Sequence, residues 1–169
     1  MSRVKISWFL FIFLMIFATS CQKNKWAEWE RKLIDDYIKS LGDTTYVLYP
    51  SGLYYIELIP GTGPYPVEND TVYFKYKATF TDYVEFDRND PYTVPYKYII
   101  GTFGTVEISK DVVAGVDEGL RYMKEGGTSR LLTPSSLAWG FEGIPGIVAG
   151  YTPIVWTIEL DSVKAGPGK

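Results

Sequence analysis

The stretch TVYFKYKATF, residues 71–80, alternates between two kinds of side chain along its whole length. One set of alternate positions is apolar or aromatic: Val72, Phe74, Tyr76, Ala78 and Phe80. The other set is mostly polar: Tyr73, Lys75, Lys77 and Thr79. Successive side chains of a β-strand point to opposite faces of a sheet, so the pattern predicts a strand with one face on a core and the other in water.

Shorter segments on both sides of this strand continue the β pattern. We expect further strands at residues 53–59, 84–86, 96–100, 128–133 and 154–161. The only helical candidate among them is VVAGVDEGLRYM, residues 112–123, and its Gly115 and Gly119 weaken it. The sequence therefore predicts an α+β fold, in which an antiparallel sheet of five to six strands curls around one short α-helix.

An amphipathic helix is predicted before the sheet, over residues 22–42. Its apolar side chains lie at helical spacing on one broad face: Trp26, Trp29, Leu33, Ile34, Tyr37, Ile38 and Leu41. Asp35 and Asp36 are adjacent and diverge by about 100°, so a solvated face is a better interpretation than an acid–base pair. We expect this helix either to pack on the domain or to space it from a membrane. The domains are then residues 21–45 (helix and linker), residues 46–164 (the sheet domain) and residues 165–169 (a disordered tail).

The first twenty residues have the pattern of a targeting segment. Arg3 and Lys5 give a positive start, and residues 8–18 form an unbroken apolar run. The run ends in Ala-Thr-Ser-Cys, which resembles a lipoprotein signal and predicts that Cys21 is lipidated. Ala18 stands where such signals usually have Leu, and a plain signal peptide with an incidental cysteine is the alternative. We expect a lipid-anchored protein of the bacterial cell envelope, on the outer membrane facing the periplasm or exposed at the surface.

Composition excludes several classes of function. Removing Arg3 and Lys5 with the signal peptide leaves 15 of the 17 basic residues against 20 acidic ones, so we expect no nucleic-acid partner. The chain has no histidine, which excludes Ser-His-Asp and Cys-His catalysis and the usual histidine-based zinc sites. Cys21 is the only cysteine, so the domain has no internal disulfide. We expect no cofactor and no metal.

The segment before the last strand is unusually apolar for a loop. In SLAWGFEGIPGIVAGYTP, residues 136–153, the large apolar side chains from Trp139 to Tyr151 are spaced by four glycines and a proline. Loops normally run through water and are polar. The apolar character of this loop therefore indicates a role beyond connecting two elements.

The order of these segments resembles that of the FKBP-type peptidyl-prolyl isomerases. The resemblance runs from about Gly52 to Val163 and includes EFD (85–87), PYKYIIG (95–101) and the run from VVAGVDEGL (112–120) through SLAWG to VWTIEL (155–160). It implies a sheet curled around one short helix, with an apolar pocket between them that binds a proline ring. It further implies a monomer whose partners are proline-containing segments of exported proteins, with the membrane reached through Cys21.

The resemblance also implies which residues form the pocket. The positions that match catalytic ones are Tyr76, Phe86, Asp87, Trp139 and Trp156. The positions that match substrate-binding ones are Tyr96, Val112, Val113, Val116, Ile144, Ile147 and Val148. Among these, Val113 is the position whose backbone N–H meets a substrate carbonyl.

Four positions depart from the family pattern. Val116 replaces the usual Trp of the pocket floor, and Trp139 replaces a loop Tyr. Tyr96 and Trp156 stand at two positions that are usually Phe. The segment before the helix is also longer than usual in the family, by an insertion at residues 102–111. The insertion suits a lid, a partner-binding loop or a larger bulge.

Purely structural roles are the alternative for several of these residues. Tyr76, Phe86 and Trp156 also suit a core, and Asp87 also suits a turn. Three functions follow: an isomerase that assists the folding of exported proteins, a binding module with little turnover, and a structural lipoprotein.

Overall fold

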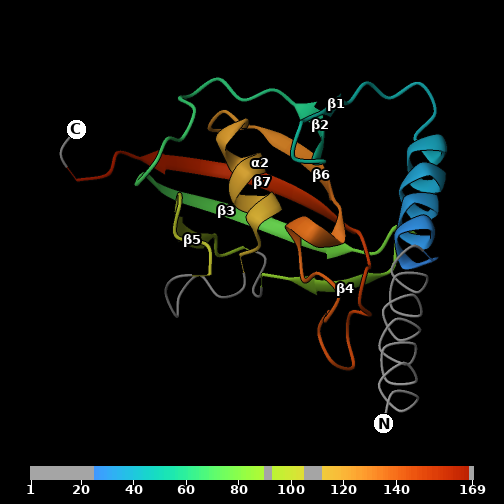
Figure 1. Ribbon diagram of the computed structural model, residues 1–169. Helices are drawn as coiled ribbons and strands as arrows, with labels where there is room; N and C mark the ends of the chain where they lie inside the picture. The colour runs from blue at the N-terminus through green and yellow to red at the C-terminus, as the bar shows by residue number, and fades with distance from the viewer. Residues whose placement is uncertain (1–24, 90–92, 105–111, 168–169) are drawn as a thin grey trace, which may run out of the picture.

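The computed structural model describes residues 25–89, 93–104 and 112–167 of the 169-residue chain (Figure 1). A helix over residues 25–40 comes first. The remaining elements in chain order are β1 (Val47–Leu48), β2 (Tyr54–Ile59), β3 (Thr71–Thr79), β4 (Glu85–Arg88), β5 (Tyr96–Ile99), α2 (Ala114–Arg121), β6 (Thr128–Thr133), the 3₁₀ turn η2 (Ser135–Leu137) and β7 (Ile154–Lys164). The predicted α+β fold class is confirmed.

The strands form one antiparallel sheet around its two longest members. Its order is β1-β2-β6-β7-β3-β4, and β5 also pairs with β3. Strand β3 pairs along its whole length with β7, from Thr71 opposite Lys164 to Thr79 opposite Val155. Within the described residues the sheet has seven strands. The strand that the sequence did not predict is β1, whose two residues are too few to show a period.

Helix α2 packs across the inner face of the sheet (Figure 1). Val72, Phe74 and Ala78 of β3 are buried on this face, as their alternation predicts. Gly119, which lowers helix propensity, has a packing role here. A Cβ at Gly119 would lie 2.3 Å from Leu131 Cδ1 of β6, so glycine lets the helix approach the sheet closely.

The outer face of the sheet carries the helix of residues 25–40 at one end (Figure 1). Ile34 and Tyr37 are buried against Leu132 of β6 and Val155 of β7. The helix therefore packs on the sheet domain, which was one of the two predicted roles. Gly42, just after the helix, has a φ of +61°, as suits the predicted stop.

The predicted signal peptide and Cys21 lie outside the described residues, as do residues 105–111 of the long segment before α2. Within the described parts of the chain, no helix has the length and apolar character needed to cross a membrane.

Candidate functional site

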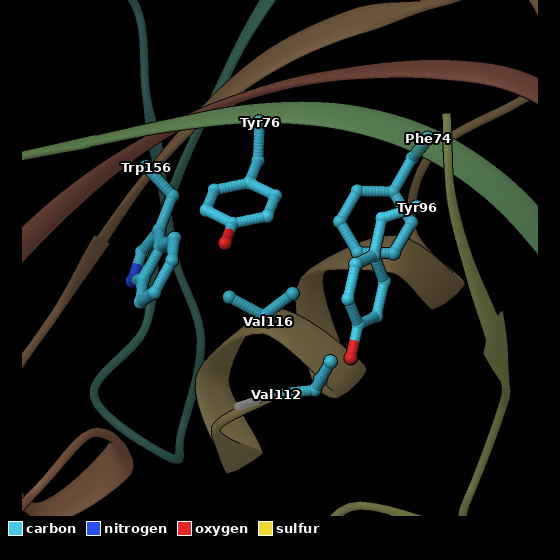
Figure 2. A pocket seen from close by; sticks show the side chains of 6 residues that line it. All are labelled: Phe74, Tyr76, Tyr96, Val112, Val116 and Trp156. Atoms are coloured by element: carbon cyan, nitrogen blue, oxygen red, sulfur yellow. The ribbon is translucent and has the colours of Figure 1, made fainter. Parts of the chain in front are cut away.

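A pocket lies between the inner face of the sheet and the start of α2 (Figure 2). Six side chains line it: Phe74, Tyr76, Tyr96, Val112, Val116 and Trp156. The space among them is about 240 Å³, part of it open to solvent. Four of the six are aromatic, so the pocket presents ring faces and edges to a ligand.

The aromatic rings contact one another at angles that leave a hollow between them. The Tyr76 ring lies 5.8 Å from Trp156 at a tilt of 57°, and it meets Tyr96 edge-on at 6.2 Å. In the view of Figure 2, Val116 lies between Trp156 and Tyr96, on the helical side of the hollow. These centroid separations fall within the 4.5–7 Å range of favourable aromatic pairs.

Internal hydrogen bonds engage the polar ends of two of these rings. The Trp156 indole N–H donates to Thr133 Oγ1 at 3.1 Å, and that hydroxyl donates to the Ile154 carbonyl at 3.1 Å. The Tyr76 hydroxyl donates to Asp87 Oδ2 at 3.0 Å. Both rings are thereby held in orientation, and their apolar surfaces are left for a ligand.

A family model described as FKBP-type peptidyl-prolyl cis-trans isomerase matches residues 63–161, more than half of the chain. The chain belongs to this family. It is 35% identical over 117 residues to the FKBP-type peptidyl-prolyl cis-trans isomerase FkpA of Escherichia coli, covering 69% of this chain and 40% of that protein. It is also 32% identical over 147 residues to the outer membrane protein MIP of Legionella longbeachae, covering 86% of this chain and 59% of that one.

Solved FKBP-type structures share the fold. The crystal structure of Escherichia coli FkpA is similar with a TM-score of 0.69 at 29% identity, covering 99% of this chain and 75% of that one. A Pseudomonas syringae peptidyl-prolyl cis-trans isomerase is similar with a TM-score of 0.68 at 26% identity, covering 84% of this chain and 96% of that one.

Five of the residues implied by the FKBP resemblance line the pocket: Tyr76, Tyr96, Val112, Val116 and Trp156. Phe74 lines it as well, although its alternation suggested only a core position. Phe74 and Tyr76 share one face of β3, and they line the pocket between the core positions Val72 and Ala78.

Phe86, Asp87 and Trp139 lie next to this group. Strand β4 carries Phe86 and Asp87, with Asp87 opposite Ala78 in the register, so Asp87 lies in a strand rather than a turn. The half-buried Phe86 ring stacks on Phe80 at 4.6 Å and meets the Trp139 ring edge-on at 6.0 Å. Trp139 in turn lies 5.7 Å from Trp156. An aromatic row thus continues from the pocket over β4 and the loop.

The apolar side chains of the loop differ in how far they are buried. Ile144 and Val148 pair through two backbone hydrogen bonds of 2.8 and 2.9 Å, which close a tight turn. Val148 is buried in the core and Ile144 is half-buried beside it, whereas Ile147 at the turn is 57% exposed. None of the three is among the side chains that line the pocket.

The residue before α2 has an amide suited to a ligand. Val113 is the N-cap, with φ −87° and ψ 159°, and it is buried. Its carbonyl accepts hydrogen bonds from the Val116 and Asp117 amides. Among the described residues, no acceptor takes the Val113 N–H.

Sequence reasoning missed the role of Asp117. This buried carboxylate accepts hydrogen bonds from the Tyr98 hydroxyl and the Gly101 amide, both at 2.7 Å, and pairs with Arg121 at 2.9 Å. Burial, together with the Asp117 carboxylate, raises the pKa of Tyr98 above its ordinary value. The network ties β5 and the segment after it to α2. Its sequence signal was an acidic residue in the first turn of a helix, which is too common to single out.

Proposed function

We propose that the chain is a peptidyl-prolyl cis-trans isomerase that assists the folding of exported proteins. The observation that carries the proposal is the aromatic pocket between sheet and helix, in which Tyr76 and Trp156 already have internal hydrogen-bond partners. Such a pocket offers a proline ring an apolar surface. FkpA, which spans a longer chain, is named an isomerase of this type, and this chain covers only 40% of its length.

The proposed mechanism is preferential binding of a twisted amide. Rotation about a peptide bond crosses roughly 18–20 kcal/mol because twisting destroys the resonance of the amide. The planar amide is more strongly dipolar than the twisted one, so a dry aromatic pocket disfavours the planar form relative to the twisted form. This is differential binding of the transition state, and it needs neither a nucleophile nor a titrating base.

Two groups at the pocket would orient the substrate. The Val113 N–H, which no acceptor among the described residues takes, would donate to a substrate carbonyl beside the proline and fix the register of the peptide. Asp87 accepts from the Tyr76 hydroxyl, and its carboxylate adds a negative field near the amide carbon as that carbon loses conjugation.

A binding module with little turnover is the second candidate. The observation that favours it is Val116, which is 2% exposed and occupies the position of the usual floor Trp. A smaller floor removes aromatic surface from beneath the proline. Tyr96 and Trp156, both larger than the usual Phe, refill part of that volume.

The test of the enzyme is catalysis of cis/trans exchange in an apolar-Xaa-Pro peptide by the full chain in mild detergent. We expect acceleration by the natural chain and a loss of about tenfold or more in kcat/KM for Phe86→Ala and Asp87→Ala. Phe141→Ala, which removes a 68% exposed aromatic from the loop of residues 136–153, is the control and keeps the natural rate. Saturable peptide binding without acceleration would instead establish the binding module.

We also propose a bacterial envelope location with a lipid on Cys21. The relative MIP is named an outer membrane protein, and the apolar run before Cys21 fits a lipoprotein signal. We expect Cys21→Ala to move the protein from the membrane fraction to the soluble fraction. Retention of the variant in the membrane fraction would contradict the anchor.

A further inference from the structure

The helix of residues 25–40 contacts the loop that carries Trp139 through a carboxylate. Glu30, half-buried on this helix, accepts a hydrogen bond from the Ser135 backbone N–H and another, of 3.0 Å, from the Ser135 hydroxyl. Ser135 is itself 4% exposed. Both donors of one buried residue are therefore satisfied by an acid 105 positions earlier in the chain.

Ser135 needs an outside partner because of what precedes it. It opens the turn η2, whose N-cap is Pro134, and no side-chain hydrogen bond from the cap serves the turn. Proline has no donor, and its ring carries no acceptor. The Glu30 carboxylate takes the place of the missing cap.

The same helix also contacts the far end of the loop. Trp26 stacks on Tyr151 with ring centroids 5.9 Å apart and planes 3° from parallel. Tyr151 has a φ of +60°, a conformation that a residue with a side chain adopts only when its surroundings hold it there. The Tyr151 N–H donates to the Gly140 carbonyl at 2.8 Å.

Backbone hydrogen bonds join the two ends on either side of Trp139. The Gly140 N–H donates to the Ser135 carbonyl at 2.8 Å, so Ser135, Gly140 and Tyr151 form one connected frame. Trp139 precedes Gly140 in this frame, and its ring lies 5.7 Å from Trp156. Glu30 contacts this frame at Ser135 and Trp26 contacts it at Tyr151, so the helix of residues 25–40 touches both ends of the frame that carries Trp139.

We propose that Glu30 is a positioning residue for the proline pocket, and that the helix of residues 25–40 is part of the functional unit rather than a spacer. This inference rests on the proposed isomerase function for its kinetic readout, but not for its binding and exchange readouts. Without Glu30 the loop frame samples more arrangements, and substrate binding must order it again.

The test compares Glu30→Ala with Glu28→Ala in the full chain, because Glu28 is an exposed acid on the same helix. We expect Glu30→Ala to raise KM, and the Kd for an apolar-Xaa-Pro peptide, about fivefold, with kcat within about twofold of the natural chain. Backbone amides at 135, 138 and 140 should exchange hydrogen faster in this variant. Glu28→Ala should match the natural chain in every readout.

Two further variants separate positioning from mere stability. Glu30→Gln keeps one acceptor and should fall between the natural chain and Glu30→Ala. Adding Ser135→Ala to Glu30→Ala should weaken binding by less than the product of the two single effects, because both variants remove the hydrogen bond from the Ser135 hydroxyl to Glu30.

The outcomes distinguish this inference from the isomerase proposal. A lower Tm for Glu30→Ala with unchanged KM, Kd and loop exchange would overturn the positioning role and leave the isomerase intact. A natural chain that binds peptide without turnover would refute the isomerase. In that case the fivefold change in Kd and the faster loop exchange would still establish the role of Glu30.

Discussion

Thr133 fixes the orientation of the largest ring in the pocket. Its hydroxyl accepts the buried Trp156 indole N–H, and valine has nearly the same shape without that acceptor. We expect Thr133→Val to lower the free energy of unfolding by about 1–3 kcal/mol, because an indole donor is left buried and unpaired. Denaturant unfolding followed by tryptophan fluorescence measures this.

The matched control for this variant is Thr157→Val, in the same strand as Trp156 but half-exposed. It should change stability by no more than about 0.5 kcal/mol. Equal losses in the two variants would show that the hydroxyl of Thr133 has no special role.

The alternation of apolar residues along a strand does not distinguish side chains that line a pocket from those in the core. Phe74 and Tyr76 have the same period and the same face, yet only the family resemblance separated Tyr76 from the core. Glu30 gave no signal at all, because its partner Ser135 is distant in sequence and the two meet only through packing. Val116 of α2 and Trp156 of β7, by contrast, were named as pocket positions by the family resemblance, and both line the pocket of the structure.

At the scale of elements, α2 depends on glycine for its distance from the sheet. Gly119→Ala should raise helix propensity by about 1 kcal/mol, but its methyl group would meet Leu131. We expect the steric clash to outweigh the gain in helix propensity, with a net loss of about 1–3 kcal/mol in the free energy of unfolding, measured by urea unfolding.

A double variant tests that explanation. In a Leu131→Ala background the added methyl group enters the space that the leucine leaves. There, Gly119→Ala should be neutral or stabilising. A loss of the same size in both backgrounds would assign the effect to the helix backbone instead.

The elements themselves were largely readable from periodicity. The strand at residues 71–79 and the strand at 128–133 follow their patterns almost to the residue. Strand β7 runs to Lys164, past the predicted end at Asp161, because its pairing with β3 continues there. Trp26 and Trp29 belong to the apolar face predicted for the first helix, yet they stay 42% and 39% exposed. Trp26 stacks on Tyr151 of the loop.

At the scale of the whole molecule, the tyrosines make stability depend on alkaline pH. Burial raises the pKa of Tyr37, Tyr49, Tyr54, Tyr55, Tyr98 and Tyr122 above the ordinary value of 10.0. Above pH 10 the unfolded chain loses these protons while the folded chain keeps them, so ionisation lowers the free energy of the unfolded state relative to the folded state. We expect stability to be constant just below pH 10 and to fall steeply above it.

Denaturant unfolding between pH 8 and 11 checks this, with the ultraviolet absorbance of tyrosinate as a second signal. Tyr98→Phe should reduce the slope of stability against pH above the ordinary tyrosine pKa. An unchanged slope in that variant would mean that Tyr98 ionises at its ordinary pKa in the natural chain, and would contradict the Asp117 network.

The neighbouring indoles of Trp139 and Trp156 give the molecule an optical signature. Their rings are 5.7 Å apart and tilted by 42°. At that separation the electronic transitions of two like chromophores couple, and a tilted pair produces circular dichroism bands of opposite sign. One indole is fixed by Thr133 and the other sits on a loop, so any movement of the loop changes the couplet. A ligand that moves the Trp139 ring relative to Trp156 would therefore be detected by circular dichroism of the unlabelled protein.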